Sequence, residues 1–198
     1  ARIYGINSLT GAINIITKKL TQSGFLISSY AGSNFEKDAE GSGKTFNGRG
    51  IQFGAVLSKE KHQHSLFASH DASNGYRFNT GFENNKLLYQ GRFQINSSNE
   101  IEALFGYTKN GFGANGFYAA PGDKNSDEVV QTTLASIQSK SVLSARWTLM
   151  SRFSYRYNDD DYRYFGPARL DAGRSRHYTN SLAGEVNTTY NTGKGELG

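Results

Sequence analysis

The chain has 198 residues, of which 36% are hydrophobic and 13% aromatic, and its formal net charge is +5 at pH 7. It has no cysteine, which excludes disulfide bonds and thiolate metal sites, and it has no run of about 18 apolar residues, which excludes a transmembrane helix within this sequence. Its basic residues are scattered along the chain, whereas a nucleic-acid-binding surface requires a basic patch, so we expect no nucleic-acid partner.

The first predicted element is a short strand over residues 11–17, which follows a Tyr4-Gly5 pair. By periodicity alone, this segment is typical of an ordinary buried strand after a glycine turn. In the order of its residues it resembles the closing segment of the plug domain in TonB-dependent outer-membrane receptors. The residues that match are Tyr4, Gly5, Gly11, Ile13, Asn14, Ile15, Thr17 and Lys18.

This resemblance implies a domain organisation. Residues 1–23 would be the C-terminal end of the plug domain with its linker, and residues 24–198 would be the N-terminal portion of the β-barrel domain. Within the plug segment, the residues expected to have a structural or coupling role are Tyr4, Gly5, Gly11, Asn14, Thr17 and Lys18. Barrels of this receptor class have about 22 strands, so we expect this sequence to be an incomplete piece of a longer receptor.

Eight strands are predicted after the plug segment, because apolar and polar residues alternate with a period of two in much of this region. We place them at 24–32, 49–58, 64–71, 86–96, 100–109, 130–138, 143–157 and 178–190. The connections between them alternate in length. Long connections fall at 33–48, 72–85, 110–129 and 158–177, and short ones at 59–63, 97–99 and 139–142. Long outer loops alternating with short turns are typical of transmembrane barrels.

The predicted strand 143–157 has two different faces. One face carries Arg146, Arg152 and Arg156, and the other carries Trp147, Leu149, Phe153 and Tyr155. Charges are costly in contact with lipid, so the arginines should line the lumen and the apolar set should face outward. A soluble sandwich with one solvated face is the alternative, but soluble strands usually have about five or six residues. We therefore predict an all-β fold, an antiparallel up-and-down transmembrane β-barrel fragment of about eight strands.

The long connection 110–129 is the best candidate for ligand binding, because it is rich in glycine and aromatic residues. Its central part resembles an outer loop of cobalamin (vitamin B12) receptor-like members of the family, which implies ligand contacts by Phe112, Asn115, Phe117 and Tyr118. Aromatic rings offer a large contact area with few rotatable bonds. The alternative is a loop that packs on its own aromatic rings.

We expect no metal site, no cofactor and no enzymatic activity. Asp159, Asp160 and Asp161 could offer oxygen ligands to Ca²⁺, but they lack the glycine and the ligand spacing of an EF-hand, so a solvated acidic loop tip is expected. His62 and His64 have no third ligand near them in sequence and, with His70 and His177, are interpreted as ordinary polar surface. No catalytic triad or phosphate-binding loop is present in the sequence.

Together these features predict part of a TonB-dependent receptor in the outer membrane of a Gram-negative cell. The resemblance implies active uptake of a scarce small molecule, with a corrinoid such as cobalamin favoured over an iron-siderophore. It also implies contact with outer-membrane lipid, a TonB-type energy-coupling protein that acts through plug residues not contained in this sequence, and a surface lipoprotein partner. The alternative is a soluble all-β carbohydrate-binding or adhesin module.

Overall fold

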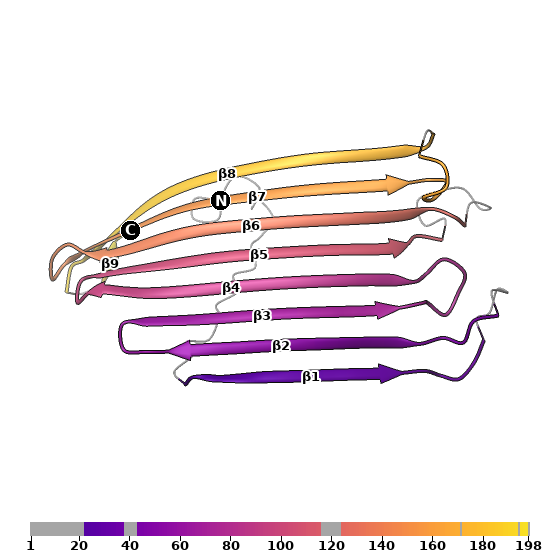
Figure 1. The fold of residues 1–198 in the computed structure, drawn as a ribbon. Helices are drawn as coiled ribbons and strands as arrows, with labels where there is room; N and C mark the ends of the chain where they lie inside the picture. The colour runs from indigo at the N-terminus through magenta and orange to yellow at the C-terminus, as the bar shows by residue number, and fades with distance from the viewer. Residues whose placement is uncertain (1–21, 38–42, 116–123, 171, 194, 198) are drawn as a thin grey trace.

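The computed structural model describes residues 22–37, 43–115, 124–170, 172–193 and 195–197. These residues form one antiparallel sheet in which each strand pairs with its neighbours in the sequence (Figure 1). The strands are β1 (Gly24–Gly32), β2 (Gly48–Ser58), β3 (His62–Ser73), β4 (Phe82–Asn96), β5 (Asn99–Gly113), β6 (Asp127–Val142), β7 (Trp147–Arg163), β8 (Arg174–Asn191) and the two-residue β9 (Glu196–Leu197).

The expected all-β class and the antiparallel meander are confirmed. The described strands do not close into a barrel: the sheet order runs from β1 to β9, and no pairing joins these two edges. The described part of the chain contains no helix, and hence none long and apolar enough to cross a membrane.

All four long connections leave and rejoin the strands at one end of the sheet, as Figure 1 shows. They are residues 33–47, 74–81, 114–126 and 164–173, whereas residues 59–61, 97–98, 143–146 and 192–195 make the connections at the other end. We call these the long-loop end and the short-turn end. The predicted alternation of long and short connections is therefore confirmed.

Several predicted strand boundaries are wrong, because cross-strand pairing extends the strands into segments predicted to be loops. Strand β6 continues through the predicted turn 139–142, and β7 begins at Trp147. The turn between them is closed by the Leu143 N–H, which donates to the Trp147 carbonyl oxygen at 2.9 Å. At the long-loop end, β5 continues to Gly113 and β7 to Arg163.

The described sheet has almost no hydrophobic core of its own. Ala114 is the one buried apolar residue among the described residues, while large apolar side chains such as Phe25 and Val186 are 79% and 69% exposed. Folded domains usually bury apolar surface between two packed layers. A single curved layer with apolar groups exposed on this scale must therefore meet another surface or an apolar medium.

Candidate functional site

The two faces of the sheet differ in chemistry, and the strand register defines them. Arg92, Glu102, Gln138, Arg152 and Glu185 are cross-strand neighbours in one row across β4–β8, so they lie on the same face. We call this the groove face. The residues next to them in sequence lie on the opposite face, which we call the apolar face.

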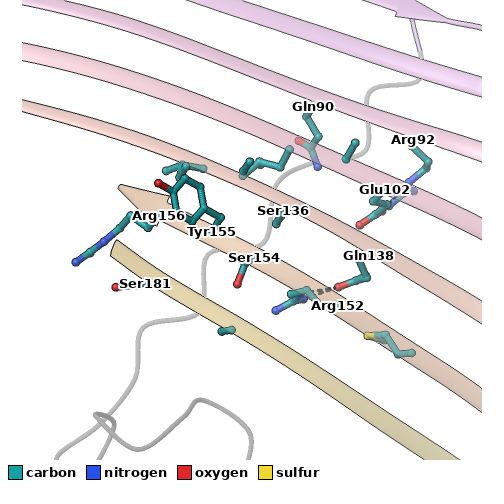
Figure 2. A pocket seen from close by; sticks show the side chains of 16 residues that line it. Gln90, Arg92, Glu102, Ser136, Gln138, Arg152, Ser154, Tyr155, Arg156 and Ser181 are labelled. Atoms are coloured by element: carbon teal, nitrogen blue, oxygen red, sulfur yellow. Dashed lines mark hydrogen bonds and ion pairs between the residues drawn. The ribbon is translucent and has the colours of Figure 1, made fainter. Parts of the chain in front are cut away.

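A groove of about 1000 Å³ lies on the groove face (Figure 2). Strands β4 to β8 provide its lining, which includes Gln90, Ser136, Ser154, Arg156 and Ser181 beside the arginine and glutamate residues. Alternation places these side chains together, because residues at every second position of each strand point to one face. The groove therefore combines charged and polar groups with apolar side chains such as Leu104, Leu134 and Met150.

Ion pairs cross the strands within this groove. Arg92 Nε donates to Glu102 Oε1 at 2.8 Å, and Arg152 Nε donates to Gln138 Oε1 at 2.9 Å. Arg152 Nη1 is also 3.3 Å from Glu185 Oε1. These contacts fix the orientation of two arginines, as Figure 2 shows for Arg152 and Gln138. Charge-assisted hydrogen bonds of this kind stabilise charged side chains on a sheet face that is only partly exposed to water.

The predicted separation of Arg152 and Arg156 from Trp147, Leu149, Phe153 and Tyr155 is confirmed by the register of β7. The prediction for Arg146 is wrong. Because β7 begins at Trp147, Arg146 lies in the preceding turn, where its Nη1 donates to the Tyr190 hydroxyl at 3.3 Å. Tyr190 is the cross-strand partner of Trp147, so this arginine reaches toward the apolar face.

The apolar face carries a band without Asp, Glu, Lys or Arg. On β7 this band runs from Tyr157 to Trp147, and the register continues it across the neighbouring strands. Its exposed large side chains include Phe25, Ile27, Phe53, Leu57, Leu66, Phe105, Ile137, Phe153, Leu182 and Val186. A shallow hollow of about 380 Å³ lies in it between Ile137, Phe153 and Val186, where Gly184 has no side chain to fill the space.

Aromatic pairs lie at both limits of the band. The rings of Trp147 and Tyr190 are 4.8 Å apart at the short-turn end, and those of Tyr157 and Tyr178 are stacked at 6.4 Å toward the long-loop end. Ten residue steps separate Trp147 from Tyr157, which corresponds to about 33 Å along a strand. At a strand tilt of about 40°, this is a height of about 25 Å, the height of the apolar band of outer-membrane barrels.

Beyond Tyr157, the apolar face becomes ionic. Asp159 accepts two hydrogen bonds from Arg176, at 2.9 and 2.7 Å, and Asp161 accepts two from Arg174, at 2.7 and 2.8 Å. These hydrogen bonds are the main reason why the pKa of each carboxyl is lowered. The expectation of a solvated acidic loop tip is wrong, because β7 extends to Arg163 and both carboxylates are paired across strands.

Asp160 lies on the groove face, with Glu128 as its diagonal neighbour on β6. Glu128 is only 7% exposed, and burial, followed by the hydrogen bond and charge of Asp160, raises its pKa. Sequence reasoning missed Glu128, because two consecutive acidic residues, Asp127 and Glu128, just before a predicted strand give no signal that one of them is buried.

The candidate ligand residues lie near the long-loop end. Phe112 is a residue of β5 rather than of a loop; it pairs with Phe82 and Glu128 and lies on the groove face. Asn115 follows the strand and has a positive φ of 42°, a conformation that asparagine adopts more readily than most residues. The structure brings Phe112 close to Glu128, which the sequence did not suggest.

Asn79 joins two of the long connections, and sequence reasoning missed it. Its Nδ2 donates to the carbonyl oxygens of Lys124 and Ser126, at 2.7 and 2.6 Å. A Cβ at Gly113 would overlap the side-chain and backbone oxygens of Asn79, so glycine is required for this close approach. We call these contacts of Asn79 with Gly113, Lys124 and Ser126 the Asn79 clamp. It holds the connection 74–81 against the residues on both sides of the candidate ligand loop.

The remaining candidate residues lie outside the described residues. These are Phe117 and Tyr118 of the ligand loop and the plug-motif residues Tyr4, Gly5, Gly11, Asn14, Thr17 and Lys18. Their predicted roles stay predictions.

His62 and His64 are neighbours on the apolar face at the short-turn end. His62 Nδ1 is 3.2 Å from His64 Nε2, and His64 Nδ1 is 2.8 Å from the Tyr89 hydroxyl. His64 also packs edge-on against Phe93, with the ring centroids 5.3 Å apart. The pair is thus part of an aromatic cluster.

Comparisons of the chain with protein-family models, with curated proteins and with solved structures found no match.

Proposed function

We propose that this chain is part of a TonB-dependent receptor of the Gram-negative outer membrane, with the apolar face in lipid and the groove face toward a lumen. One observation carries the proposal: at the same level of the same strands, one face has no charged residue while the other carries Arg92, Glu102, Arg152, Arg156 and Glu185. A bilayer on one side and water on the other is the environment that suits both faces.

The near-absence of a hydrophobic core among the described residues disfavours the alternative of a soluble carbohydrate-binding or adhesin module. Such a module would bury Phe153 and Leu182 between two layers, yet these side chains are 53% and 68% exposed. In lipid, open sheet edges do not occur. The proposal therefore requires further strands to pair with β1 and β9 in the complete receptor.

The receptor function itself is supported by the resemblance of residues 1–19 to the end of a plug domain. In this proposal the long-loop end faces the cell exterior and binds the ligand, for which a corrinoid is favoured over an iron-siderophore. A TonB-type protein supplies energy through the rest of the plug, and a surface lipoprotein assists ligand delivery. The chain would act as a transporter and not as an enzyme.

Tryptophan fluorescence tests the membrane part of the proposal, because Trp147 is the one tryptophan of the chain. In vesicles with brominated acyl chains, Trp147 should be quenched, and a Trp147→Phe, Phe153→Trp variant should be quenched more strongly by bromines deep in the bilayer. The matched control is Trp147→Phe with Ser154→Trp, which moves the indole to the groove face. Equal quenching of the Phe153→Trp and Ser154→Trp variants, or no quenching of either, would refute the assignment of the apolar face to lipid.

Uptake tests the receptor part separately. Cells that express the complete receptor should accumulate radiolabelled cobalamin only when TonB is present. Accumulation of ferric siderophore instead would correct the ligand class, and the absence of TonB-dependent accumulation of either would contradict the receptor function even if the sheet is in lipid.

A further inference from the structure

His62 and His64 lie side by side at the start of β3, and both side chains are on the apolar face. Alternation along a strand places residues at every second position on the same face. His62 Nδ1 is 3.2 Å from His64 Nε2. Two nitrogen ligands of a tetrahedral Zn²⁺ ion, each at about 2.0–2.1 Å from the metal, are about 3.3–3.4 Å from each other. The distance between the two ring nitrogens is therefore close to that of two ligands of one metal ion.

Groups on β4 hold the ring of His64 in place. Its Nδ1 is 2.8 Å from the Tyr89 hydroxyl oxygen, and the ring packs edge-on against Phe93. Histidine ligands usually make such a hydrogen bond with the nitrogen that does not bind the metal, and this bond fixes the tautomer and the plane of the ring. When Nδ1–H of His64 donates to Tyr89, Nε2 carries the lone pair that faces His62.

Gly91 makes this support possible. It is the cross-strand partner of His64, and a Cβ at this position would lie 2.7 Å from the Tyr89 hydroxyl oxygen and 3.0 Å from Phe93 Cε2. The two aromatic rings thus occupy the space that a side chain at position 91 would need. Pairing of β3 with β4 brings these groups together, so no local sequence pattern indicates the arrangement.

The surroundings provide nitrogen ligands and no excess of negative charge. The turn before His62 contains Lys59, Glu60 and Lys61, and the described residues contain no group of three His, Cys, Asp or Glu side chains that could hold a metal. A bound ion would therefore be selected by the imidazole nitrogens. Imidazole suits Zn²⁺, Cu²⁺ and Ni²⁺, whereas Mg²⁺ and Ca²⁺ prefer oxygen ligands.

We propose that His62 Nδ1 and His64 Nε2 bind one Zn²⁺ ion, with Tyr89 as a positioning residue and water at the remaining coordination positions. The ion takes the place of the proton between the two nitrogens. This proton passes to Nε2 of His62, so both imidazoles stay neutral. The lack of a third ligand in the sequence favours ordinary polar surface, whereas the nitrogen spacing and the support from Tyr89 favour a two-histidine site.

The zinc site does not depend on the proposed receptor function. It rests on contacts within β3 and β4 at the short-turn end, whereas the proposed ligand site is at the long-loop end. Zinc binding and ligand uptake can therefore fail independently of each other.

Calorimetric titration with zinc chloride tests the proposal on the full chain in detergent, prepared without a polyhistidine tag. We expect one Zn²⁺ per chain, which neither Ca²⁺ nor Mg²⁺ displaces. His62→Gln and His64→Gln should each weaken Zn²⁺ binding by about tenfold or more, because each removes a ligand. Tyr89→Phe should weaken it by about tenfold, as expected for the loss of a hydrogen bond that orients a ligand.

His70→Gln and His177→Gln are the matched controls, because the rings of these histidines contact Asn85 and Ser175 and not a second histidine. Both variants should bind Zn²⁺ as the unmodified chain does. A loss of similar size in these controls and in the His62 and His64 variants would overturn the proposal.

Absence of Zn²⁺ binding by the unmodified chain would also overturn it and would leave the histidine pair as a hydrogen bond within the aromatic cluster. Unchanged affinity in both His62→Gln and His64→Gln would overturn the assignment of the ligands, and unchanged affinity in Tyr89→Phe would overturn the positioning role of that residue. His62 is an exposed residue at the first position of β3, so its variant tests the site even if His64→Gln misfolds.

Discussion

Arg152 and Phe153 are consecutive residues of β7 with opposite environments. The Arg152 guanidinium lies 3.3 Å from the Glu185 carboxylate on the groove face, while the Phe153 ring is 53% exposed in the uncharged band. A period of two makes this separation unavoidable in a regular strand. The same contrast recurs in the neighbouring strands and is the basis of the assignment of the two faces.

A charge placed in the middle of the band should destabilise the protein in a bilayer. Val186→Arg is expected to lower the free energy of unfolding in lipid vesicles by about 2–4 kcal/mol, because Val186 is 69% exposed on the apolar face. The control is Asn187→Arg, one residue along β8 on the groove face. Denaturant titration in vesicles measures both variants. A loss of similar size in the two would argue against lipid contact.

A methyl group at Gly113 should be costly. Gly113→Ala would push a Cβ into the Asn79 oxygens, and we expect a loss of about 1–3 kcal/mol in the free energy of unfolding, as for other overpacked sites. Gly111→Ala is the control on the same face of β5, where the new Cβ meets its nearest atom, Val129 Cγ2, at an ordinary 3.8 Å. If the two variants have the same free energy of unfolding, the Asn79 clamp is absent in solution.

Acid should weaken the ion pairs at the long-loop end. Arg176 and Arg174 lower the pKa of Asp159 and Asp161, so the folded-state values lie below the unfolded value of about 3.9. The pairs therefore stabilise the fold above that pH, and the stabilisation is lost as the pH falls through the folded-state pKa. The free energy of unfolding, measured from neutral pH into the acid range, should fall less with pH in the Asp159→Asn variant than in the unmodified chain.

Arg176→Gln should flatten the same pH profile, because it removes the other half of the Asp159 pair. An unaltered acid profile in both variants would show that the pair contributes nothing to stability in this pH range.

The candidate ligand loop can be tested in the complete receptor. Replacing Phe117 and Tyr118 together by alanine should weaken cobalamin binding by about tenfold or more, since aromatic contacts contribute about 1 kcal/mol each beyond area burial. Phe165→Ala is the control, because this aromatic ring lies on a different long connection and packs against Tyr164. Titration with cobalamin measures the affinities. Equal affinity in the double variant and the unmodified receptor would remove the loop from the site.

The amino-acid sequence alone determined the all-β class, the order of eight strands and the alternation of long and short connections, because these depend on local periodicity and turn composition. It also placed Arg152 and Phe153 on opposite faces. The ends of the strands were harder to predict from the sequence. Whether residues 110–113 and 158–163 join the ladder depends on the pairing available from neighbouring strands, which no local pattern reports.

Only the tertiary structure decided which side chains meet across strands. The contact of Arg152 with Glu185, the reach of Asn79 to Lys124 and Ser126, and the juxtaposition of Glu128 with Asp160 all join residues that are far apart in the chain. Such contacts are set by register, and a shift of one residue would turn every side chain of a strand to the other face. Periodicity determines that two faces exist, whereas register determines which charges on each face find a partner.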